Sequence, residues 1–102
     1  LDFCICNLFD ESCPAEVSSY MKKMLEHNGE YRVECNRPYS GAYITFNYCQ
    51  PRRKIYTLQL EVNRKLYMNE KTYHKTAQFQ NISDNLSGAI TKLGNFLLDF
   101  NK

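Results

Sequence analysis

The sequence predicts an α+β fold in which an antiparallel sheet of three to four strands, arranged as a meander, is flanked by an N-terminal and a C-terminal amphipathic helix. Apolar residues recur at helical spacing near both ends of the chain, and apolar and polar residues alternate between them. The 102 residues are close to the commonest size of one domain, so we expect residues 1–102 to form a single domain.

The N-terminal region predicts an apolar arm followed by a helix. Residues 1–9 could form a short edge strand or a packed arm. Pro14 favours a helix start because proline is tolerated at the first helical position, and Asn28-Gly29 favours its end. The apolar residues between them follow at i, i+3, i+4, i+7 and i+8: Val17, Tyr20, Met21, Met24 and Leu25.

The centre of the chain has a period of two, which is typical of half-buried strands. We expect strands at residues 31–35, 42–49 and 55–62, and a fourth near residues 66–68. The turn-forming residues between them predict tight connections, among them a hairpin turn at Asn63-Arg64.

The C-terminal region predicts a second helix that covers the sheet. Ser83-Asp84 is a good N-cap. A wide apolar face follows: Leu86, Ala89, Ile90, Leu93, Phe96, Leu97 and Phe100. Gly88 and Gly94 lower helix propensity, so we expect them where this helix approaches the sheet closely.

Five cysteines lie in the first half of the chain, and they favour disulfide bonds: Cys4, Cys6, Cys13, Cys35 and Cys49. We expect a bridge from Cys35 or Cys49 to the Cys4–Cys13 arm, and the odd cysteine would allow a disulfide-linked homodimer. Buried free thiols are the alternative. Cys4 and Cys6 lack the spacing of zinc motifs, so we expect no metal and no cofactor.

Charge and motifs exclude several classes of function. The formal net charge is only +2, and the basic clusters lie at opposite ends of one predicted strand, so we expect no nucleic-acid binding. No apolar run is long enough for a membrane span. His27, His74 and Lys75 could act as acid and base, but no motif supports this, so we expect no catalytic residue and no enzyme activity.

Two further patterns bear on the alternatives. The order helix, strands, helix is similar to that of double-stranded-RNA-binding domains, although the second helix opens with Ser83-Asp84-Asn85 where that family carries a Ser-Lys-Lys run. Asn81-Ile82-Ser83 and Asn85-Leu86-Ser87 are sequons that would allow glycosylation of a secreted protein.

These observations favour a secreted, disulfide-stabilised, non-enzymatic protein-binding domain of the effector, inhibitor or recognition type. The alternative is a cytoplasmic interaction or dimerisation module with a degenerate double-stranded-RNA-binding-like fold. The partner would be another protein, whose identity the sequence does not show.

The predicted contact surface lies at one end of the meander, where two turns would meet. Tyr and Arg often dominate binding energy. The predicted partner-binding residues are therefore Arg37, Tyr39, Arg64 and Lys65. The sheet face at Tyr43, Thr45 and Thr57 is the next candidate.

Overall fold

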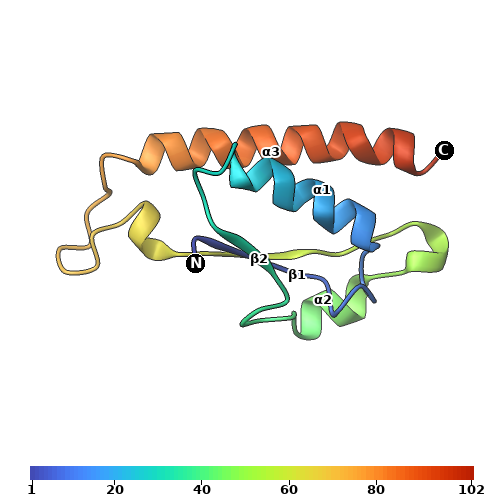
Figure 1. Cartoon of the computed structure of the whole chain (residues 1–102). Coiled ribbons are helices and arrows are strands. Elements are labelled where there is room, and N and C mark those ends of the chain that lie inside the picture. Colours follow the sequence, from blue (N-terminus) through green and yellow to red (C-terminus); the bar gives the residue numbers. More distant parts are fainter.

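A computed structural model describes all 102 residues, with three strands, three α-helices and two short 3₁₀ helices. In chain order these are β1 (Phe3–Cys6), α1 (Ala15–Glu26), β2 (Val33–Cys35), α2 (Tyr43–Tyr48), η1 (Pro51–Arg53), β3 (Gln59–Val62), η2 (Arg64–Leu66) and α3 (Phe79–Phe100). Figure 1 shows α1 and α3 on one side of the strands and the short helix α2 on the other.

The three strands form a mixed sheet in the order β2-β1-β3. β1 runs parallel to β2 and antiparallel to β3, so the α+β class is confirmed and the antiparallel meander is wrong. The apolar arm forms the central strand, and all four of its residues are at most 2% exposed. Of the two forms predicted for residues 1–9, the strand is therefore present, but it is the central strand and not an edge strand. A buried central strand reads as a continuous apolar run, so alternation does not mark its position in the sheet.

The core lies between this sheet and the helices α1 and α3. Its buried members are Phe3, Ile5, Met21, Leu25, Val33 and Ala89. The predicted apolar face of the first helix is confirmed, because Val17, Met21 and Leu25 are buried. The rings of Tyr20 and Phe96 stack with centroids 4.3 Å apart and hold α1 against α3.

The predicted second strand, residues 42–49, is wrong. Most of this segment forms the helix α2, which buries Thr45 and exposes its aromatic residues. Gly41 precedes it with φ +116°, and a Cβ at that position would lie 3.2 Å from the Thr45 side chain. The apolar residues of this segment alternate with polar ones but do not face the core, so their period did not reveal the backbone conformation.

The second half of the chain departs from the predicted strands and caps. The predicted hairpin at Asn63-Arg64 is replaced by η2, and residues 66–68 contribute only an isolated bridge between Met68 and Lys75. α3 begins at Phe79 rather than at Ser83. A Cβ added at Gly88 or Gly94 would meet no atom within 4 Å, so the expected close approach is wrong as well.

All five cysteines are free thiols, so the predicted disulfides are wrong. The sulfur atoms of Cys4 and Cys6 lie 3.7 Å apart on the same face of β1, which is too far for a covalent bond. Burial raises the pKa of Cys6 to about 12 and that of Cys13 to about 11. Cys35 and Cys49 are only half-buried and make no bridge to the N-terminal arm. The prediction that the protein is secreted rested mainly on these disulfides, so its main support is gone. No helix of this structure could span a bilayer.

A buried asparagine ties three segments together at the end of β1. Asn7 is 1% exposed, its backbone N–H donates to the Asn36 Oδ1 at 3.0 Å, and the Asn36 Nδ2 donates back to the Asn7 Oδ1 at 2.8 Å. The Asn7 Nδ2 also lies 2.7 Å from Ser18 Oγ and 3.2 Å from the Cys13 carbonyl. The ends of β1 and β2 and the start of α1 therefore share one side-chain amide.

The first prediction concerns the thiols. The mass of the unreduced protein should equal that of the reduced protein, and all five thiols should react with iodoacetamide in denaturant without reductant. In the native protein at pH 8, Cys49 should react before Cys6 and Cys13, because a thiol reacts as its thiolate and burial keeps these two protonated. Raising the pH toward 11 should accelerate labelling of Cys13 before Cys6. Fewer than five reactive thiols in denaturant would show a disulfide.

The second prediction concerns Asn7. Asn7→Ala should lower the free energy of unfolding by about 3 kcal/mol, because it leaves the buried Ser18 hydroxyl and the half-buried Asn36 amide without this partner. Urea denaturation followed by circular dichroism measures the change. Asn95→Ala, an exposed asparagine of α3, is the matched control and should leave the midpoint unchanged or slightly raised. Equal midpoints for the two variants would contradict the role of Asn7.

Candidate functional site

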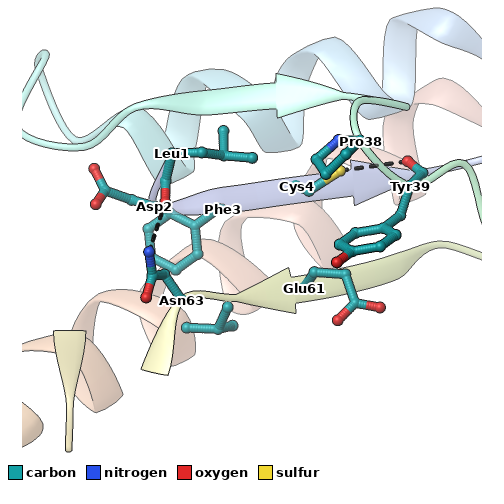
Figure 2. Close-up of a pocket in the computed structure, with 9 residues that line it drawn as sticks. Leu1, Asp2, Phe3, Cys4, Pro38, Tyr39, Glu61 and Asn63 are labelled. Carbon is teal, nitrogen blue, oxygen red and sulfur yellow. Dashed lines mark hydrogen bonds between the residues drawn. The ribbon is translucent and has the colours of Figure 1, made fainter. Parts of the chain in front are cut away.

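A pocket of about 330 Å³ opens where β1 begins and β3 ends (Figure 2). Its polar groups are two carboxylates, a phenol, an amide and a thiol, which come from Asp2, Glu61, Tyr39, Asn63 and Cys4. Leu1, Phe3, Pro38 and Val62 complete the wall. A concave surface with several converging polar groups is the usual form of a binding or active site.

The carboxylate of Glu61 faces away from the helices because the sheet is pleated. Leu60 and Val62 pack against the core, so Glu61 between them points to the opposite face. Cys4 pairs with Glu61 on β3 and with Glu34 on β2, so the three residues form one row across the sheet. Two strand spacings separate Glu34 from Glu61, which is about 10 Å.

The two carboxylates of this row differ in their partners. Glu34 lies 3.9 Å from the Arg32 guanidinium in an exposed ion pair. Glu61 takes part in no ion pair, and its Oε1 accepts a hydrogen bond from the Gln59 Nε2. Of these two glutamates, Glu61 alone lines the pocket, and its carboxylate has no cationic partner.

A chain of side-chain hydrogen bonds connects Glu61 to the helix α2. The Thr45 hydroxyl donates to Gln59 Oε1 at 3.2 Å, and Gln59 in turn donates to Glu61. Thr45 is 3% exposed, and its carbonyl accepts from the Thr57 hydroxyl at 2.6 Å. Because Thr45 is held at both its hydroxyl and its carbonyl, this series of hydrogen bonds restricts the positions that the Glu61 carboxylate can take.

Tyr39 lines the pocket from the loop that follows β2. Its carbonyl accepts from the Cys4 thiol at 3.4 Å, and the backbone N–H of Leu8 donates to the Ser40 carbonyl at 2.7 Å. These contacts fold residues 37–40 back over β1, and Figure 2 shows the Tyr39 ring beside the Glu61 side chain. The phenol is 58% exposed, so it can donate a hydrogen bond to a ligand.

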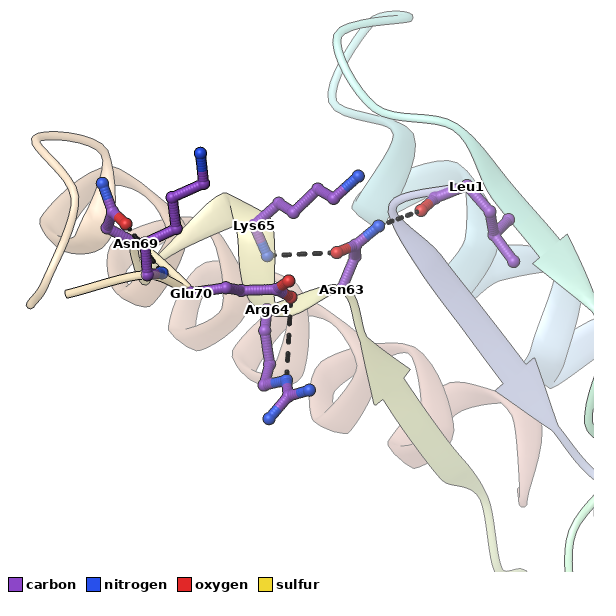
Figure 3. Close-up of polar contacts among 7 residues, drawn as sticks. Leu1, Asn63, Arg64, Lys65, Asn69 and Glu70 are labelled. Atoms are coloured by element: carbon purple, nitrogen blue, oxygen red, sulfur yellow. Dashed lines mark hydrogen bonds and ion pairs between the residues drawn. The ribbon is translucent and has the colours of Figure 1, made fainter. Parts of the chain in front are cut away.

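The four residues predicted to bind a partner come from two segments, residues 37–39 and 64–65, and both segments adjoin the pocket. Tyr39 lines the pocket, and Arg37 is exposed two residues before it. Arg64 lies in η2, where its Nε is 3.8 Å from the Glu70 carboxylate (Figure 3). The backbone N–H of Lys65 donates to Asn63 Oδ1, while its ammonium group is exposed. Binding of a partner by these residues stays a prediction.

The reason given for grouping these residues is wrong. It assumed a meander, but β2 and β3 run in opposite directions, so the ends of β2 and β3 lie at opposite ends of the sheet. Tyr39 reaches the end of β3 only because its loop folds back across β1. Sequence analysis missed Glu61 and Gln59, although two polar residues that alternate with Leu58, Leu60 and Val62 were a usable signal of a functional face.

The histidines considered as acid and base lie outside the pocket. His27 follows α1 and pairs with Glu30 at 3.6 Å, and His74 is exposed. No group of three or more His, Cys, Asp or Glu side chains is placed to hold a metal ion. The expectations of no cofactor and no nucleic acid stay predictions.

Comparison with protein families finds a match. The model of the N-formylglutamate amidohydrolase family matches residues 1–68, which is two thirds of the chain and includes β1, β3 and every polar residue of the pocket. No curated protein matches the sequence.

Comparison with solved structures supports the fold. The crystal structure of an N-formylglutamate amidohydrolase from Ralstonia eutropha is similar over 96% of this chain, with a TM-score of 0.87 and 23% sequence identity. The match covers 35% of that enzyme, so this chain spans about a third of its length.

These findings overturn the functional prediction. A chain of an enzyme family is neither a non-enzymatic protein-binding domain nor a degenerate double-stranded-RNA-binding module, and the prediction of no enzyme is wrong. The sequence contains no local catalytic motif, and the pocket collects Asp2, Tyr39 and Glu61 from three separate segments. The chain belongs to the N-formylglutamate amidohydrolase family.

Proposed function

We propose that this chain forms one wall of the active site of a hydrolase that cleaves the formyl amide of N-formylglutamate into formate and glutamate. Membership of the family supports the reaction class. The observation that carries the assignment of the site is the Glu61 carboxylate, which lines the pocket, pairs with no cation and is positioned by Gln59 and Thr45.

The groups of this wall suit amide hydrolysis. The Glu61 carboxylate can accept a proton from water while the water oxygen bonds to the formyl carbon. The Tyr39 hydroxyl can donate a hydrogen bond to the carbonyl oxygen as it gains negative charge. The bond between the formyl carbon and the nitrogen then breaks, and the proton held by Glu61 passes to the leaving amine.

The charge of the pocket indicates which end of the substrate faces this wall. N-formylglutamate carries two carboxylates, and the pocket holds the acidic residues Asp2 and Glu61 with no lysine or arginine among its lining residues. Like charges repel in a partly enclosed site. The formyl group therefore faces Glu61, and the substrate carboxylates point toward cations supplied from outside this wall.

The third prediction tests Glu61 in a chimaera of the Ralstonia eutropha enzyme in which this chain replaces the matching third. The chimaera should release formate from N-formylglutamate. Glu61→Gln should lower kcat at least about a hundredfold, because the amide cannot accept the proton. Glu34→Gln is the matched control, since Glu34 lies in the same row but pairs with Arg32, and it should retain most of the rate. A wild-type rate for Glu61→Gln would remove Glu61 from the chemistry.

The fourth prediction tests the hydrogen-bond chain from α2. Thr45→Val removes the hydroxyl that holds Gln59 and should lower kcat about two- to tenfold with little change in KM, as expected for one net hydrogen bond. Thr45→Ser keeps the hydroxyl and should restore the rate. The melting temperatures of both variants should be measured as well. If Thr45→Ser lost as much kcat as Thr45→Val, and kcat fell in step with the melting temperature, a positioning role for the hydroxyl would be contradicted.

A further inference from the structure

We propose that the outward face of α2, formed by Tyr43, Ile44, Phe46 and Tyr48 and called here the α2 apolar face, docks against the part of an amidohydrolase fold that this chain does not contain. The identity of the partner rests on the proposed function. The occupant is the remaining part of that fold, and not a second copy of this chain.

The polarity of α2 is reversed relative to a helix that packs on its own domain. Four of its six residues are large and apolar, and they are 75%, 71%, 66% and 64% exposed in chain order. The buried residue is the polar Thr45. Surface helices normally bury their apolar residues and expose their polar ones, so this helix is built to be covered from outside.

The apolar side chains are not what holds α2 in place. A helix of six residues is not stable on its own. In this one, the Thr45 carbonyl accepts a hydrogen bond from the Thr57 hydroxyl, and the Thr45 hydroxyl donates to Gln59. The backbone at Gly41 also lies close to the Thr45 side chain. Since these contacts anchor the helix through Thr45, the four exposed apolar side chains remain available for a partner.

The comparison with the Ralstonia eutropha enzyme indicates what covers this face. The structural match covers 96% of this chain at a TM-score of 0.87, yet it covers only 35% of that enzyme's chain. The helices α1 and α3 already cover one side of the sheet, while α2 lies on the other side (Figure 1). The rest of such an enzyme has this second side to pack against.

The chemistry of the face fits a large apolar protein surface. α2 contains no charged residue, so it offers no attraction to a phosphate backbone or to a charged peptide. Exposed contiguous apolar patches mark protein interaction sites. The pocket wall lacks the cations that a dicarboxylate substrate needs, so a body docked on this side would complete both the apolar contact and the substrate site.

The docked helix is also connected to the reacting groups. Thr45 lies within α2 and holds Glu61 through Gln59. A partner that immobilises α2 therefore immobilises the Glu61 carboxylate as well.

Hydroxyl-radical footprinting read by mass spectrometry tests the proposal. The side chains of Tyr43–Tyr48 should be oxidised rapidly in the isolated chain and several-fold more slowly in the chimaera. Tyr73 and Leu98, which are 78% and 71% exposed and lie outside α2, are internal controls and should react similarly in both. Equal oxidation of α2 in the two proteins would overturn the proposal, as would a chimaera that does not fold.

Variants and oligomeric state complete the test. The double variant Ile44→Gln/Phe46→Gln should leave the melting temperature of the isolated chain unchanged and destabilise the chimaera, whereas Leu98→Gln should affect neither. Analytical ultracentrifugation shows whether a second copy is the occupant instead: a discrete dimer of the isolated chain in which α2 is protected would overturn the proposal.

The readout separates this proposal from the proposed reaction. A chimaera that protects α2 but releases no formate would contradict the proposed function and leave the docking intact. An active chimaera whose α2 stays exposed would contradict the docking alone.

Discussion

The amide pair of Asn7 and Asn36 is the contact on which both the fold and the site depend. Each side chain donates to or accepts from the other at the end of the central strand, where Asn7 is buried. A buried amide without partners would be costly, so the pair specifies how the ends of β1 and β2 lie relative to each other. Asn36 is also the residue from which the loop carrying Tyr39 begins, so the same contact directs that loop over the sheet.

The two faces of the sheet have separate roles because strand side chains alternate. Phe3 and Ile5 contact the helices and form the core, whereas Cys4 and Glu61 point to the other face. The face that packs against the helices stabilises the fold, since buried apolar area is the main favourable contribution to folding. The other face is then free to carry polar groups that would weaken a core.

The sheet face that α1 and α3 leave uncovered is the basis for proposing that this chain is part of an active site. Its pocket holds carboxylates and a phenol but no lysine or arginine, and its helix α2 displays apolar side chains on the same side of the sheet (Figure 1). Each feature is incomplete alone. Together with the match to about a third of the Ralstonia eutropha enzyme, they support the proposal that this chain forms one wall of a larger catalytic structure.

The sequence by itself determined the α+β class and both long helices, because their apolar faces repeat at helical spacing and Val17, Met21 and Leu25 lie buried as that spacing predicts. It also determined the alternation of β3, in which Leu60 and Val62 face the core and Glu61 does not. Only the tertiary structure decided that the N-terminal arm is the central strand, since burial on both faces removes the alternating pattern. It alone decided that residues 43–48 form a helix, because the polar anchors of Thr45 lie far along the chain. For the same reason, the meeting of Asp2, Tyr39 and Glu61 in one pocket follows from strand order and loop path, which local spacing does not encode.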